Sequence, residues 1–216
     1  MLMRSLAIAA VTAASFVTGF HAQAASETLN YTVTRDGSSI GTHSIAIDTN
    51  GASTQVEVNT DIEVKVLFVT AYQFKHVSKE VWNAGQLVSL NSTTNDDGTD
   101  KALNAKAENG KITADSTVQG QERRQHADAT TLPASLWNQA TVKQSALLNT
   151  LDGVLMKVEV EDKGMEDVSA GGSNVSAHRY SITGELTRDL WFDAKGRLVR
   201  MQFPDKTNSE IVYALD

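Results

Sequence analysis

Apolar and polar residues alternate with a period of two along most of the chain. From Gln55 to Lys65 almost every even position is apolar and every odd position is polar. Such alternation is typical of a strand with one face on a core and the other in water. Between Val175 and Phe203 the same pattern occurs twice, interrupted at Asp193–Gly196. This second stretch predicts a β-hairpin with a glycine-containing loop.

The apolar phase that starts at Val56 continues through Tyr72 and Phe74 toward Trp82. A single strand over that distance would be far longer than usual, because each residue advances about 3.3 Å. We therefore expect the chain to turn at Leu67–Ala71, where alternation gives way to a solid apolar run. Two interpretations are open: a buried corner, which we favour, or an exposed apolar loop that meets a ligand or partner.

Short turn signals separate the other alternating segments. Asn-Gly between two such segments is a strong hairpin signal. The turns are expected at Asp36–Ser38, Asn50–Gly51, Asn83–Gly85, Asn95–Gly98, Asn109–Gly110 and Ala170–Asn174. The pattern predicts a mainly β fold, a single antiparallel meander that forms a strongly curved sheet or an open half-barrel.

The period changes only between Gly120 and Gly153. Pro133 stands near the start of an apolar turn, and Ser145 precedes a run rich in leucine that ends at Gly153. A serine cap and a glycine stop are marks of a helix. We predict a short helical insert around residues 132–152.

The first residues follow the plan of an export signal. Arg4 precedes an apolar run, and Ala22-Gln23-Ala24 offers small residues for cleavage. We predict a cleaved signal peptide at 1–24, a single β-rich domain at 25–216, and a periplasmic or secreted protein. No later segment is apolar enough to anchor the mature chain in a membrane.

Charge and cysteine content narrow the chemistry. The net charge of −7 becomes −8 without Arg4, which disfavours nucleic acid as a partner. With no cysteine, neither disulfides nor thiolate ligands can form. No two histidines stand at metal-ligand spacing, so we expect no metal and no cofactor. Glu80 and Asp189 each lie close to a tryptophan in sequence, but a surface carboxylate is the commoner case, and we name no catalytic residue.

Several short motifs resemble an uncharacterised group of exported proteobacterial proteins that carries a domain-of-unknown-function label. The match spans most of the mature chain. Its motifs consist of residues that form hairpins, not of residues that carry out chemistry. They are Glu80-x-Trp82, Gly85-x-Leu87, Thr93-Thr94-Asn95-x-x-Gly98, Leu132-Pro133-x-Ser135-x-Trp137-Asn138 and Tyr180-x-Ile182-x-Gly184-x-Leu186-x-x-Asp189-Leu190-Trp191-Phe192-Asp193-x-x-Gly196. More distantly, the order of elements is similar to periplasmic lipoprotein carriers, whose half-barrel holds lipid chains under a helical lid, which is a likeness of fold alone.

The amount of one-sided apolar sheet favours a non-catalytic binding or carrier protein for an apolar, lipid-like ligand. An alternative is a cell-envelope structural or protein-interaction module with a packed β core and an envelope protein as partner. An enzyme of unknown type comes third, because no set of catalytic groups converges in the sequence. The residues we expect to line a ligand site are Phe68, Tyr72, Phe74, Trp137, Leu148, Tyr180, Ile182 and Met201.

Overall fold

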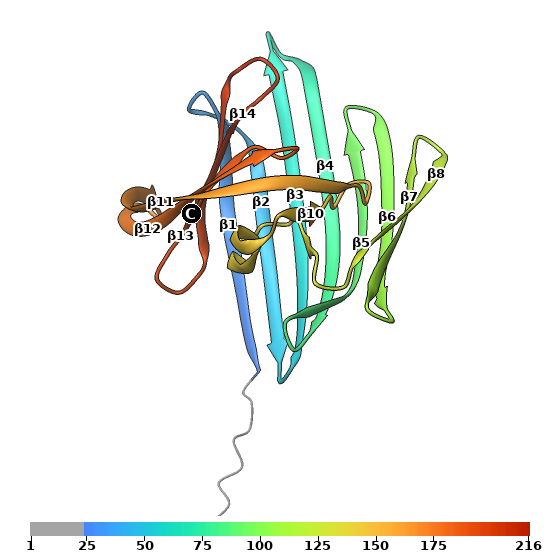
Figure 1. The fold of residues 1–216 in the computed structure, drawn as a ribbon. Coiled ribbons are helices and arrows are strands. Elements are labelled where there is room, and N and C mark those ends of the chain that lie inside the picture. Colours follow the sequence, from blue (N-terminus) through green and yellow to red (C-terminus); the bar gives the residue numbers. More distant parts are fainter. Residues whose placement is uncertain (1–23) are drawn as a thin grey trace, which may run out of the picture.

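A computed structural model describes residues 24–216, so the predicted signal peptide lies outside the described residues apart from Ala24. Fifteen strands and one 3₁₀ turn make up the fold (Figure 1). In chain order they are β1 (Ala25–Arg35), β2 (Ser38–Asn50), β3 (Ser53–Val66), β4 (Val69–Asn83), β5 (Gln86–Asp96), β6 (Thr99–Glu108), β7 (Lys111–Val118), β8 (Gln121–Asp128), β9 (Leu132–Pro133), η1 (Gln139–Lys143), β10 (Ala146–Leu148), β11 (Leu155–Ala170), β12 (Ser173–Gly184), β13 (Arg188–Phe192), β14 (Leu198–Pro204) and β15 (Glu210–Leu215).

All strands join one sheet in the order β8-β7-β6-β5-β4-β3-β2-β1-β15-β14-β13-β12-β11-β10-β9. The first and last strands of the chain therefore pair in its middle, with Tyr31 opposite Leu215. Every other sheet neighbour is also a chain neighbour, and only the short β9–β10 pair is parallel. The predicted fold of one curved, unclosed antiparallel meander is confirmed.

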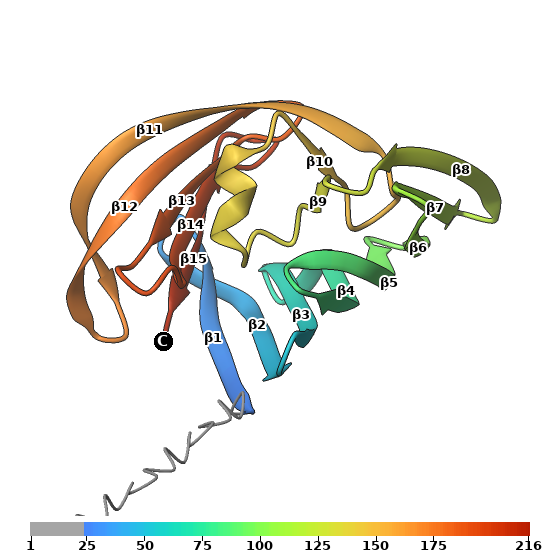
Figure 2. The ribbon, with the colours of Figure 1, turned by 60° about the horizontal axis from the view of Figure 1, so that its bottom comes forward.

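The sheet must curl strongly, because its two edge strands are consecutive in the chain. Strand β8 ends at Asp128 and β9 begins at Leu132, yet they lie at opposite edges of the sheet. Four residue steps span at most about 14 Å. The sheet thus winds round until its edges approach, and Figure 2 shows β9, η1 and β10 lying within the arch.

The predicted helical insert at 132–152 is wrong. Its ends are short strands, and its only helical part is the single 3₁₀ turn η1. Leu147 and Leu148 are consecutive and both buried. A helix with one apolar face is compatible with adjacent leucines, but here the segment lies between two layers, so an extended chain buries both sides.

This insert covers the inner face of β4 to β7. The Ser92 hydroxyl donates to the Thr150 carbonyl oxygen over 2.5 Å. Gly153 has a positive φ of 71°, and a Cβ there would stand 2.8 Å from Leu103 Cδ1 and 3.0 Å from Ala114 Cβ. The close approach therefore requires glycine. One end of the curled sheet is filled by the chain itself.

The Leu67–Ala71 run is not the buried corner that we favoured. Strands β3 and β4 are joined by a two-residue turn, Leu67-Phe68, because Val66 pairs directly with Val69. The side chains of Leu67 and Phe68 are 88% and 99% exposed. We call residues Val66–Val69 the β3–β4 tip, and Figure 1 shows it rising beyond the neighbouring turns.

Candidate functional site

The inner face of the sheet has a filled end and an open end. The insert packs on the rows of β4 around Glu80 and Trp82, which lie far from the β3–β4 tip. Nearer the tip, inward-facing apolar side chains are only partly buried, among them Val64, Phe74 and Phe203. The candidate site therefore lies at the tip end.

A row of polar side chains crosses the inner face there. The pairing register places His43 beside Thr60, Thr60 beside His76, and His76 beside Thr94. Each histidine Nδ1 is bonded to a threonine hydroxyl, His43 to Thr60 and His76 to Thr94, both over 2.8 Å. Burial lowers the pKa of each imidazole from 6.5 to about 4, and for His43 the charge of His76 contributes. Both rings are neutral at pH 7.

Strands β13 to β15 form the opposite wall. The guanidinium carbon of Arg188 lies 3.5 Å from the centre of the Phe203 ring, and that ring lies 6.0 Å from the ring of Tyr213. Tyr213 in turn meets the ring of His43 edge-on at 5.2 Å. Burial raises the pKa of Tyr213 to about 12, although the charge of Arg188 opposes that shift.

The two groups of side chains meet over strand β1, since His43 of β2 and Tyr213 of β15 flank that strand. The charge of Tyr213, on β15, helps to raise the pKa of Tyr72, on β4, although burial and the Tyr72 hydrogen bond to Asp96 contribute more. We call the inward-facing group of Phe74, His76, His43, Tyr213 and Arg188 the inner recess. Tyr213 Oη and the two histidine Nε2 atoms make no hydrogen bond within residues 24–216, and none is sealed from solvent.

Arg188 is the unusual member of this set. Its half-buried side chain donates to the carbonyl oxygen of Thr187 over 2.6 Å and forms no salt bridge within the described chain. Burial lowers its pKa from 12.5 to about 10, the charge of Tyr213 opposing the shift. By contrast Arg35, Arg179 and Arg197 each pair with aspartate at 2.7 to 2.8 Å. A cation with free donors on an apolar wall can receive an anionic group.

Six of the eight residues that we expect to line a ligand site belong to one core cluster, whereas Phe68 and Tyr72 are exposed. Tyr72 and Phe74 lie at the recess, and Phe68 lies at the tip beyond it. Ile182 and Leu148 are buried in the core, and Met201 is buried beside its strand partner Tyr213. Tyr180 packs on Phe192 and stacks on His178. Trp137 belongs to the insert and donates to Glu80 at the filled end.

Sequence reasoning did not single out Arg188, Tyr213 or His76 as site residues. Among these residues only Arg188 breaks the local sequence pattern. It is a charged residue at an inward-facing position of β13, and the inward-facing positions that follow it on this strand are apolar. The register that joins β13 to β15 and β1 is not readable from local pattern.

Glu80, which we expected at the surface, is 1% exposed. Its Oε2 accepts from the indole nitrogens of Trp82 and Trp137, each over 2.9 Å, and its Oε1 has no partner. Burial is the largest influence on its pKa and raises it above 4.5, although the indole donors and Ser135 act in the opposite direction. The carboxyl ties the insert to β4 and touches no open space, so it serves the fold.

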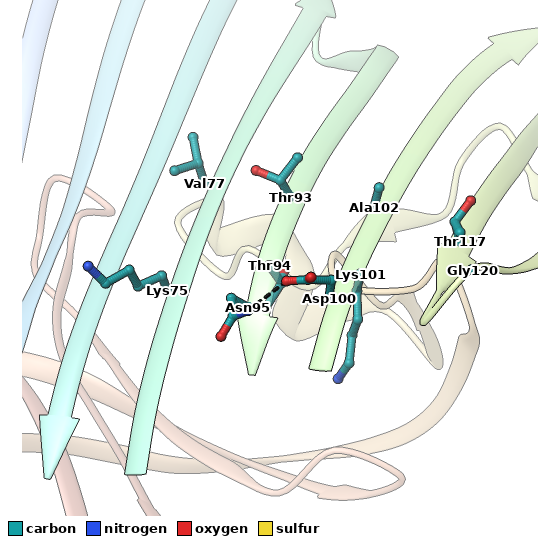
Figure 3. A pocket seen from close by; sticks show the side chains of 10 residues that line it. All are labelled: Lys75, Val77, Thr93, Thr94, Asn95, Asp100, Lys101, Ala102, Thr117 and Gly120. Atoms are coloured by element: carbon teal, nitrogen blue, oxygen red, sulfur yellow. Dashed lines mark hydrogen bonds between the residues drawn. The ribbon is translucent and has the colours of Figure 1, made fainter. Parts of the chain in front are cut away.

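Two open hollows of the described chain lie outside the inner recess. One, of about 440 Å³, lies over β4 to β7 and is lined by Lys75, Val77, Thr93 and Lys101 among others. Figure 3 shows these side chains spread apart, with Asn95 and Asp100 hydrogen-bonded over 2.6 Å. Another, of about 740 Å³, lies near the β1–β2 turn among charges of both signs, and Ile40 and Val64 also line it. Neither brings together a set of groups that suggests chemistry.

Comparison with known protein families finds a match for this chain. The sequence model of DUF6134, a domain of unknown function, matches residues 31–216. The chain belongs to the DUF6134 family. The resemblance to an uncharacterised family of this kind is thereby confirmed. No match was found among curated proteins.

A solved structure similar to this DUF6134 chain is the beta-barrel-like protein of domain of unknown function DUF1849 from Brucella abortus. The two share 13% sequence identity with a TM-score of 0.63, over 88% of this chain and 94% of that one. The likeness shows a barrel-like fold. Within residues 24–216, no helix is long and apolar enough to cross a bilayer, and no three acidic, histidine or cysteine side chains gather to hold a metal ion.

Proposed function

We propose that this DUF6134 chain is a non-catalytic binding protein of the periplasm that holds an apolar, lipid-like ligand at the open end of its curled sheet. The observation that carries the proposal is the contrast between the two ends of the inner face. The insert fills one end with leucine side chains such as Leu147, whereas Val64 and Phe74 at the other end remain only partly covered.

The β3–β4 tip supports the same function. Its apolar side chains continue outward from Val64 and Tyr72, so an apolar surface runs from the inner recess to the end of the hairpin. A ligand with a hydrocarbon chain gains about 0.8 kcal/mol for each CH₂ that leaves water. The barrel-like fold that this chain shares with a DUF1849 protein suits a binding domain, and its curled sheet provides the concave surface that ligand sites use.

Native mass spectrometry of the protein exported in its own envelope tests this function. We expect a bound species of lipid mass, recovered by extraction, and displacement of that species by an environment-sensitive apolar dye. Val64→Trp fills the open end and should reduce both signals. Val77→Trp, on the outer face of β4, is the matched control and should leave them unchanged. Repeated recovery without ligand, together with no dye binding, would contradict the proposal.

A second candidate, docking to an envelope protein, is favoured by one observation. Phe68 projects its whole ring into solvent from a narrow hairpin, a shape that fits a pocket on another protein. A photo-reactive amino acid at position 68 should then cross-link to one partner in intact envelopes. The same amino acid at position 88, where Val88 is also exposed, is the control. Equal products from both positions would exclude this function.

A further inference from the structure

We infer that the inner recess binds the carboxylate of a long-chain acid, with Arg188 as the group that receives the negative charge. The inference rests on the proposed function and adds the class of ligand. Arg188, Phe203 and Tyr213 come from three adjacent strands, and pairing puts their side chains on the inner face.

The surroundings of Arg188 favour the binding of an anionic group next to its guanidinium. Its guanidinium lies against the face of Phe203 at 3.5 Å, which fixes its plane, and only one donor is used, on the Thr187 carbonyl. Within residues 24–216 no carboxylate reaches it, whereas most other arginines of the described chain have an acidic partner. A half-buried guanidinium with four unused N–H donors is matched by a bidentate carboxylate.

The surroundings match the rest of such a molecule. Tyr213, whose ring lies 6.0 Å from that of Phe203, offers its hydroxyl as a second donor, and the neutral His43 ring adds no charge at pH 7. Phe203, Phe74 and Val64 supply partly exposed apolar surface for the chain. A single cation suits a ligand with one negative charge, since a second would remain unpaired in a half-buried site.

The experiment compares two fluorescent probes that differ only in charge, cis-parinaric acid and its methyl ester, on the mature wild-type protein at pH 7.5. We expect the acid to bind about tenfold to a hundredfold more tightly, the range for a hydrogen bond to a charged group. Arg188→Met keeps an unbranched side chain on Phe203 and should make the two probes equal. Tyr213→Phe should weaken the preference by a few-fold.

Arg200→Met is the matched control, because Arg200 also lies over an aromatic ring, that of Trp191, at 5.6 Å. Trp191 belongs to a separate buried cluster away from the recess. This variant should keep the preference for the acid. Equal binding of both probes to the wild-type protein would overturn the inference and leave the proposed function standing. This comparison uses the wild-type protein alone, so it does not depend on the folding of any variant. Binding of neither probe would overturn both.

Discussion

Two buried histidines make the stability of this chain depend on pH in a defined range. The pKa of His43 and His76 falls from 6.5 in the unfolded chain to about 4 in the fold. Their neutral forms are therefore favoured by folding. The stabilisation is complete above pH 6.5 and is lost as pH falls from 6.5 through 4.

We expect the free energy of unfolding to decrease by about 3 kcal/mol per histidine across that range, since each pKa unit corresponds to about 1.36 kcal/mol. Urea unfolding at pH 7.5, 6, 5 and 4 measures the slope. The double variant His43→Asn/His76→Asn should flatten it, whereas His126→Asn, at an exposed position of β8, should not. An unchanged slope in the double variant would show that other groups dominate.

Glu80 acts with the opposite sign. Its pKa is raised by burial, so the neutral acid is favoured in the fold. Its contribution to stability is fully present below pH 4.5 and is lost as pH rises through the folded-state value. Glu80→Gln keeps an oxygen that accepts from Trp82 and Trp137 and removes the buried charge.

We therefore expect Glu80→Gln to raise the melting temperature at pH 8 and to have little effect at pH 4. Differential scanning calorimetry at both values measures the difference. Glu57→Gln is the control, because Glu57 is a surface partner of Lys79. A loss of stability at pH 8 would mean that the ionised carboxyl is bound more favourably than its burial indicates.

Residue-scale reasoning from sequence succeeded where the cause is local. Alternation placed Val56, Val58 and Ile62 on a buried face, and they are buried. The same reasoning failed to predict the burial of Glu80. A glutamate near a tryptophan has the same local sequence whether or not another segment covers that end of the strand. The cover comes from Trp137, which is 57 residues away.

Among the hairpins, the β3–β4 tip carries local strain that its counterparts avoid. Six other two-residue turns of the described chain have positive φ at both positions, and each has glycine at the second: Asp36-Gly37, Ala84-Gly85, Asp97-Gly98, Asn109-Gly110, Gln119-Gly120 and Gly171-Gly172. The tip instead holds Leu67 at 50° and Phe68 at 70°. Such angles cost a residue with a side chain about 1–2 kcal/mol.

Replacing Leu67-Phe68 with Asn-Gly should therefore stabilise the protein by about 1–2 kcal/mol, because both residues accept the required angles. Thermal unfolding should show a melting temperature a few degrees higher. Neither side chain is buried, so no core contact is lost. A lower melting temperature would show that the exposed side chains contribute to the fold itself. A gain in stability would show that Leu67 and Phe68 are kept at a cost to the fold, as the proposed functions require.

At the scale of elements, the sequence predicts strands and turns well and the insert poorly. A two-residue turn is set by its own residues, and Asn109-Gly110 could be located from two letters. The insert depends on being enclosed between layers, and Leu147-Leu148 fits a helix face equally well until that enclosure is known. The tip was misassigned for a similar reason, since a buried corner and an exposed loop have the same composition.

The inner recess exists only at the scale of the whole molecule. Arg188 and Tyr213 meet because β13, β14 and β15 pair in sequence, but His43 joins them only because the last strand pairs with the first. That pairing joins residues about 180 apart and has no local signature. A candidate site formed by such closure was therefore out of reach of pattern alone, although its apolar members Phe74 and Tyr72 were named.

The closure also predicts how stability is distributed. Strand β1 has a hydrogen-bonded neighbour on each side and places Tyr31 and Val33 in the core. Strand β8 has one neighbour, and most of its side chains are exposed. Hydrogen exchange followed by mass spectrometry should show the slowest amides in β1 and β15 and the fastest in β8. Because β1 and β15 are the first and last strands of the described residues, their slow exchange would mean that the seam between them is the last part of the sheet to open. Equal protection in β8 would instead require a partner for that edge, most simply a second copy of the sheet, since an unpaired strand offers its free backbone groups to any neighbour.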